Sequence, residues 1–281
     1  RNIEASRINY DLPEEYYLDQ YREDDRLQQL QNLRLNIDFS PDAKNALSFE
    51  AIGTIEGQDN DESLTSTIRK QDNTFNSSYN RRSIEISREK VAEFALNYDR
   101  KFNNKRKAFS AGISTSFNNE EENTDITSQS ITEKGQPSGD PFLQQTSNDE
   151  YTNVTNLKAD YAFPVSARAV IETGYKGILR FLDADFETLD QVDGVFVPNP
   201  LASNTFLFNE QVHAGYIQYS SSAGDAANPR WKYDAGVRAE QVWNDGNSNN
   251  KTVTFSNSYF KLFPSFNIAY YNGTAEFWKM S

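Results

Sequence analysis

The sequence of 281 residues contains no cysteine, one histidine and one methionine. The absence of cysteine excludes disulfide bonds, thiolate metal sites and cysteine nucleophiles. The single histidine, His213, leaves no histidine pair for a metal ion, and a lone imidazole on a strand is more often a lumen or interface residue than a catalyst. We therefore expect no enzyme, no metal site and no cofactor.

Long apolar segments are also missing. No run approaches the roughly 20 apolar residues that a membrane helix needs, and residues 1–10 lack the charged-then-apolar order of a signal peptide. Hydrophobic residues make up only 37% of the chain, which is low for a globule around one large core. A membrane β-barrel is compatible with this composition, because only every second residue of its strands faces lipid.

Positive charge is scarce relative to negative charge, with a net charge of −13. No basic run is long enough to follow a phosphate backbone, so nucleic acid is excluded as a partner. The acidic runs at 59–62 and 120–122 lack the ordered spacing and fixed glycine of a calcium loop. They are interpreted as solvated loop charge. No glycine-rich phosphate loop and no nucleophile-elbow serine is present.

Aromatic residues are abundant, at 13%, and apolar residues alternate with polar ones, which predicts β-strands. In residues 32–39 the apolar positions are Leu33, Leu35, Ile37 and Phe39. The same pattern predicts hairpins with strands at 32–39 and 46–56, 92–99 and 109–117, 157–163 and 171–180, 206–219 and 231–240, and from 257 to the end.

The predicted turns are short at one end of these hairpins and long at the other. Short turns are expected at 40–45, 102–106, 164–166, 224–229 and 272–273, and long polar loops at 57–81, 118–148, 183–203 and 244–250. Short periplasmic turns and long external loops are typical of outer-membrane barrels, whereas a soluble β-sandwich, the alternative, has no reason for this sidedness. Aromatic residues beside the short turns suit a membrane-interface girdle or ordinary cross-strand pairing.

The predicted fold is all-β, an antiparallel up-and-down transmembrane β-barrel of which the chain supplies about ten strands. We treat residues 1–281 as one barrel segment. Residues 1–30 are expected to be an external loop leading into a strand, although 14–31 has a rough helical spacing, and 31–281 to be consecutive membrane hairpins. The residues expected to face the lumen are Arg34, Asp38, Glu93, Lys158, Asp160, Glu172, Lys176, Arg238 and Glu240.

Several stretches resemble the barrel of TonB-dependent outer-membrane receptors, especially the Bacteroidetes-type group. They are residues 33–39, 94–117, 212–219, 235–240 and 259–265. The resemblance implies a plugged barrel of about 22 strands, so the chain would be a fragment. It lacks a recognisable plug domain, an energy-coupling box and a closing strand that ends in an aromatic residue.

The function implied by the resemblance is import of a scarce solute, such as a metal chelate, vitamin or glycan, across the outer membrane of a Gram-negative bacterium. The implied partners are outer-membrane lipid, a plug domain, the TonB complex and a surface lipoprotein or other envelope protein. Two alternatives stay open. One is a non-transport barrel that serves as an adhesin or as part of a surface or secretion complex, and the other is a soluble β-sandwich binding module.

Overall fold

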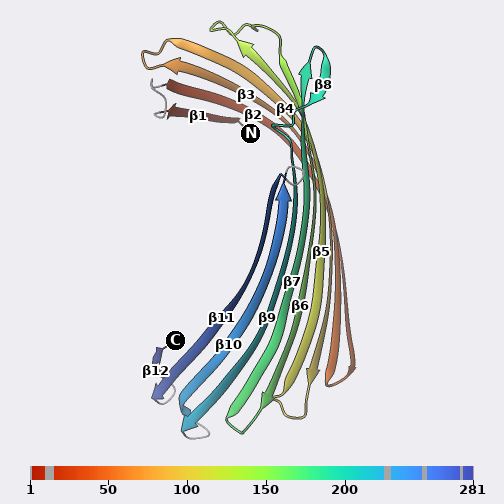
Figure 1. The fold of residues 1–281 in the computed structure, drawn as a ribbon, viewed down its shortest axis with the longest axis vertical. Coiled ribbons are helices and arrows are strands. Elements are labelled where there is room, and N and C mark those ends of the chain that lie inside the picture. Colours follow the sequence, from red (N-terminus) through yellow and green to blue (C-terminus); the bar gives the residue numbers. More distant parts are fainter. Residues whose placement is uncertain (1, 10–15, 225–228, 249–251, 273–274, 281) are drawn as a thin grey trace.

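A computed structural model describes residues 2–9, 16–224, 229–248, 252–272 and 275–280. These residues form one antiparallel sheet in which each strand pairs with the next along the chain, in the order β1-β2-β3-β4-β5-β6-β7-β9-β10-β11-β12, with the short β8 paired to β7. The sheet is a single layer that curves along the length of its strands (Figure 1). This confirms the predicted antiparallel up-and-down arrangement.

Most strands are long. Their bounds are β1 (Asn2–Asn9), β2 (Tyr16–Asp42), β3 (Asn45–Lys70), β4 (Phe75–Lys101), β5 (Ala108–Ile131), β6 (Phe142–Pro164), β7 (Ala169–Val192), β8 (Val195–Pro198), β9 (Asn204–Gly224), β10 (Pro229–Ser248), β11 (Val253–Asn272) and β12 (Ala275–Met280). Strands in globular proteins are usually 3–10 residues long, so β2, at 27 residues, extends well past the length that crosses a membrane.

The short turns lie where the sequence predicts them. The turn between β2 and β3 is closed by the Asp42 carboxylate, which accepts hydrogen bonds from the backbone N–H groups of Lys44 at 2.7 Å and Asn45 at 2.9 Å. These bonds hold the pKa of Asp42 below its usual value. Turns also follow β4 and β6. Parts of the predicted turns at 224–229 and 272–273 lie outside the described residues.

The predicted long loops differ from the structure. Most of residues 57–81 and 118–148 belongs to the paired strands β3, β4, β5 and β6, and β2 begins at Tyr16 within the segment expected to be an external loop. In these regions both faces of the sheet carry polar side chains, so the apolar alternation disappears although the backbone pairing continues. Within the same described ranges, no helix is long and apolar enough to cross a membrane.

The sheet has little of a conventional core. The buried apolar residues among those described are Ile126, Ala169, Ala214, Val242 and Ala269. Many large apolar side chains are exposed instead, including Leu33 at 77% and Phe260 at 59%. A single layer leaves both faces uncovered, so these side chains need an apolar environment that the chain itself does not supply.

Candidate functional site

The two faces of the sheet differ in chemistry. Residues directly opposite each other in an antiparallel pair share a face, and neighbours along a strand alternate between faces. Following the register from β2 to β11 assigns one set of side chains, here called the apolar face, to one side of the sheet. Its members include Leu33, Leu35, Ile37, Phe39, Phe49, Phe94, Leu96, Phe109, Ile113, Phe117, Ile171, Ile217, Val237, Leu262 and Phe266.

The opposite side, here called the charged face, carries all nine residues that the sequence analysis grouped together. The same register assigns to it Arg34, Asp38, Glu93, Lys158, Asp160, Glu172, Lys176, Arg238 and Glu240. They come from β2, β4, β6, β7 and β10. Their expected position toward the lumen of a barrel stays a prediction.

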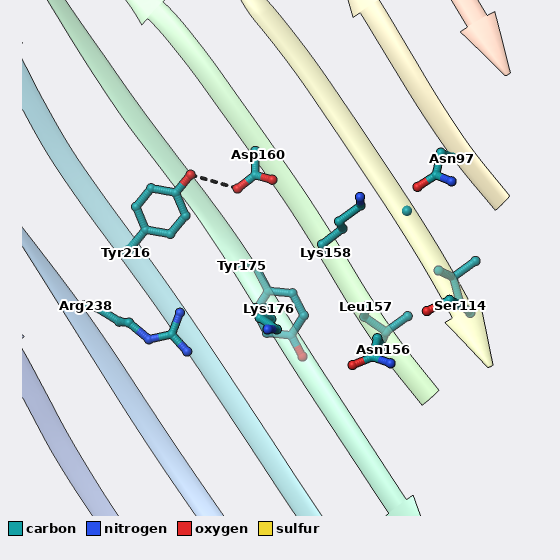
Figure 2. Close-up of a pocket in the computed structure, with 12 residues that line it drawn as sticks. Asn97, Ser114, Asn156, Leu157, Lys158, Asp160, Tyr175, Lys176, Tyr216 and Arg238 are labelled. Carbon is teal, nitrogen blue, oxygen red and sulfur yellow. Dashed lines mark hydrogen bonds between the residues drawn. The ribbon is translucent and has the colours of Figure 1, made fainter. Parts of the chain in front are cut away.

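A groove of about 480 Å³ lies over the middle of the charged face. Its polar lining comes from neighbouring strands and includes Lys158, Asp160, Lys176, Tyr216 and Arg238 (Figure 2). The Tyr216 hydroxyl donates a hydrogen bond of 2.7 Å to Asp160. Tyr216 was not predicted from the sequence, because it is uncharged and only the register, which pairs it with Arg238, puts it on this face.

Two of the cations in this groove stand directly opposite each other. Lys158 of β6 pairs in register with Lys176 of β7, and neither forms an ion pair with a described residue. Arg238, by contrast, contacts Glu240 at 2.9 Å. Directly opposed like charges on a sheet are destabilising. The two lysines therefore form a local positive patch that can accept an anionic group.

Two glycines leave the space in which these side chains lie. A Cβ added at Gly112 would stand 2.7 Å from Cε of Lys158, and one at Gly174 would stand 2.5 Å from Oδ1 of Asp160. Both distances are shorter than real Cβ contacts allow. The absence of side chains at these two positions thus lets Lys158 and Asp160 lie across the sheet.

Other predicted residues form separate contacts on the same face. Arg34 contacts Glu50 at 2.5 Å. Glu93 lines a smaller groove of about 220 Å³ together with Glu50 and Asn156. Asp38 is not among the residues that line the central groove, so the nine residues share a face without forming one site.

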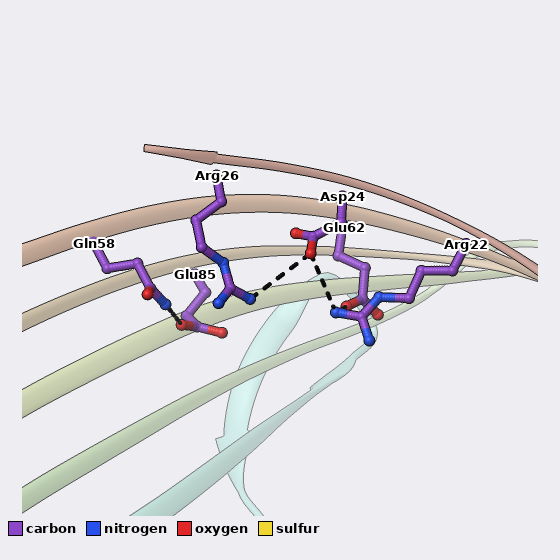
Figure 3. A network of polar contacts seen from close by, with 6 residues as sticks. All are labelled: Arg22, Asp24, Arg26, Gln58, Glu62 and Glu85. Atoms are coloured by element: carbon purple, nitrogen blue, oxygen red, sulfur yellow. Dashed lines mark hydrogen bonds and ion pairs between the residues drawn. The ribbon is translucent and has the colours of Figure 1, made fainter. Parts of the chain in front are cut away.

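A second polar group lies on β2, β3 and β4, in the parts of β2 and β3 remote from the turn that joins them (Figure 3). Arg22 contacts Glu62 at 2.5 Å and Asp24 at 3.6 Å, and Asp24 also lies 3.8 Å from Arg26. Nearby, Gln58 donates a hydrogen bond of 3.0 Å to Glu85. Glu62 belongs to the acidic run at 59–62, so part of that run is ion-paired strand rather than solvated loop.

A row of four glutamates crosses the charged face between the groove and that group. Glu56, Glu89, Glu120 and Glu150 stand directly opposite one another on β3, β4, β5 and β6. Burial and the neighbouring Glu89 and Glu150 raise the pKa of Glu120. In the part of the chain that the structure describes, no cluster of three or more acidic or histidine residues is arranged to hold a metal ion.

His213 lies on the apolar face. Its Nδ1 is 2.6 Å from the hydroxyl of Tyr175, and its ring packs edge-on to Trp243 with centroids 5.7 Å apart. The register also pairs His213 with Gly177 and Gln241, away from the groove. Its nearest ring neighbours are thus aromatic side chains of the same face.

A protein-family model described as "Outer membrane protein beta-barrel family" matches residues 100–279, which is more than half of the chain. The chain belongs to this family. Membership confirms the predicted barrel fold and the predicted location in the outer membrane. Barrels of this kind carry an apolar outward band flanked by aromatic residues, and the apolar face has this composition.

No curated protein has significant sequence similarity to this outer-membrane barrel chain. Among solved structures, it is similar to one titled "Crystal structure of ferric citrate transporter FecA in the unliganded form", with 10% identity and a TM-score of 0.45. The similarity covers 97% of this chain and 42% of that one. The chain thus spans less than half the length of the transporter it resembles.

Proposed function

We propose that the chain is the barrel portion of a TonB-dependent transporter that imports a scarce solute, such as a metal chelate, a vitamin or a glycan. In this proposal the charged face lines the lumen and the apolar face contacts lipid. The chain itself catalyses no reaction. A plug domain and the TonB complex would act with it, and a surface lipoprotein or other envelope protein is a further partner.

One observation carries the proposal. The charged face has charged residues on strands from β2 to β10. Its polar groove contains two lysines that form no ion pair with a described residue, beside the Tyr216–Asp160 hydrogen bond. A wall that only anchored an adhesin would not need unpaired charges at mid-sheet, because opposed lysines cost stability. In a barrel whose lumen holds a plug and a polar solute, these lysines would have polar or anionic groups of the plug or solute to bind.

The proposal is tested by uptake in the living cell. The gene for the full-length protein is deleted and restored, and uptake of radiolabelled metal chelates, vitamins and glycans is measured with and without the proton gradient that powers TonB. Uptake that needs both the gene and the gradient supports a TonB-dependent transporter. Gradient-independent passage of small solutes, or unchanged uptake of every solute, would favour a non-transport barrel.

Solute recognition is expected at the end of the sheet remote from the short turns. There the chain between β7 and β9 forms the hairpin with β8, in which the N–H of Asn199 donates to the carbonyl of Thr188 at 2.7 Å. Replacing residues 193–203 by a short turn in the full-length protein should weaken solute binding without loss of assembly. Binding that is unchanged after shortening this tip and the tips at 71–74 and 132–141 would contradict this placement.

A further inference from the structure

A second groove, of about 510 Å³, opens on the apolar face across β2 to β6. This volume is within the roughly 300–1,000 Å³ that is typical of ligand pockets. The groove owes its shape to one row of the register, in which Leu33, Gly53, Ala92 and Phe117 stand directly opposite one another. The two small residues form its floor, and the two large ones form its walls.

The next row of the register forms the rim of this groove. It contains Ile55, Lys90, Asn119 and Tyr151, all of which line the groove. The groove is therefore apolar along its length, and its rim holds a cation, an amide and a tyrosine hydroxyl. This arrangement fits a lipid whose acyl chain lies in the apolar part of the groove and whose anionic headgroup lies at the polar rim.

Lys90 differs from the other cations on the same side of β4. Arg88 contacts Asp59 at 2.8 Å, and Arg82 contacts Asp61 at 2.6 Å. Lys90 is exposed and has no ion pair within the described ranges. A lysine at a membrane surface without a counter-charge attracts anionic lipid headgroups.

The position of the groove along the strands indicates which leaflet of the outer membrane it faces. In outer-membrane barrels the short turns face the periplasm, and the groove lies at the end of the apolar face remote from the turns after β2, β4 and β6. Its rim is thus at the level of the external headgroups. The characteristic anionic lipid of that leaflet is lipopolysaccharide, which carries phosphates on a sugar bearing several acyl chains.

We propose that this groove is a lipopolysaccharide-binding site, in which an acyl chain lies over Gly53 and Ala92 while a phosphate contacts the ammonium group of Lys90. The inference rests on family membership and on the apolar face meeting lipid, and it is independent of transport. A barrel that transports nothing would bind the lipid equally well.

Two substitutions in the full-length protein test the contact with the lipid headgroup and the contact with the acyl chain separately. Lys90→Ala removes the cation. Gly53→Leu adds an apolar side chain to the groove, and its Cβ has room because no atom lies within 4 Å of a Cβ at this position. The matched controls are Lys105→Ala, in the turn after β4, and Gly215→Leu, elsewhere on the apolar face, where the nearest atom to a Cβ is 3.9 Å away.

The measurement is binding of purified lipopolysaccharide, intact and dephosphorylated, to the detergent-solubilised protein. Lys90→Ala should weaken binding of the intact lipid about fivefold, as expected for one lysine at a lipid surface, and leave the dephosphorylated lipid unaffected. Gly53→Leu should weaken both lipids by a similar factor. The controls should bind like the unsubstituted protein.

Gel mobility without heating reports whether each variant has folded, and Gly53→Ala replaces Gly53→Leu if the larger side chain prevents assembly. Equal binding by Lys90→Ala and its control would overturn the proposal. A change in oligomeric state with unchanged lipid binding would overturn it too, because the groove would then be a contact between protein chains.

Discussion

The contrast between the two faces predicts opposite tolerance of charge at adjacent residues. Ile113 stands opposite Leu96 and Leu157 on the apolar face and is 44% exposed, whereas the register places Ser114 on the charged face. Each is replaced by arginine in the full-length protein. The two variants add the same side chain to β5 one residue apart, so any difference in stability reports the environment of the face.

The depth of Ile113 sets the expected magnitude. The apolar side chains of β5 run from Phe109 to Phe117, eight steps or about 26 Å along a strand at about 3.3 Å per residue. A strand tilted by about 40° crosses about 20 Å of membrane over that length, close to the roughly 25 Å apolar band of such barrels. Ile113 is the central residue, so arginine there should cost about 2–4 kcal/mol.

The assay is equilibrium unfolding of the protein in lipid vesicles with guanidinium, followed by tryptophan fluorescence, to which the three tryptophans of this chain contribute. Ser114→Arg should cost less than about 1 kcal/mol, because Ser114 is a half-buried polar residue whose neighbours on the charged face are polar. Equal destabilisation by the two variants, or a larger effect of Ser114→Arg, would refute the assignment of the faces.

Three further outcomes are expected. Gly174→Val should destabilise the barrel by about 1–3 kcal/mol in the same assay, because its side chain would overlap Asp160, while Gly215→Val should cost less than about 1 kcal/mol. Glu120→Gln should raise the thermal stability at pH 7. Since the pKa of Glu120 is raised in the folded state, its charge costs stability above that pKa, and the stability difference between Glu120→Gln and the unsubstituted protein should vanish as the pH falls below about 4.3, the ordinary pKa of a glutamate. A constant difference from pH 7 to pH 4 would contradict this. Finally, the chain expressed alone in detergent-free buffer should give no monomeric peak in size-exclusion chromatography, because its apolar face is uncovered; a sharp monomeric peak would argue against a membrane-facing surface.

The strands nearest the short turns were predictable because one face is apolar and the other polar there. Alternation around Leu33 and around Ile113 identified both the strands and the face of each residue. The lysine and aspartate positions of the central groove followed from the same alternation. The register between strands was not predictable, so the direct opposition of Lys158 and Lys176 emerged only from the structure.

The parts of the strands remote from the short turns could not be predicted by alternation, because polar residues occupy both faces. One local signal was available and was missed. Asp193 and Gly194 have φ values of 50° and 80° and join β7 to β8, with Val192 paired to Val195. An Asp-Gly pair between apolar residues is a strong hairpin signal. It would have revealed structure within the segment expected to be a loop.

The continuation of the strands past the apolar face has a consequence for how the remote end would bind a solute. Flexible loops lose conformational entropy when they close on a ligand, at about 1–2 kcal/mol for each backbone residue that becomes fixed. Hydrogen-bonded strands such as β3 and β4, paired from Asn45 to Arg69, have already lost that freedom on folding. A solute that contacts this wall meets a preorganised surface, so its affinity would not be reduced by ordering the protein.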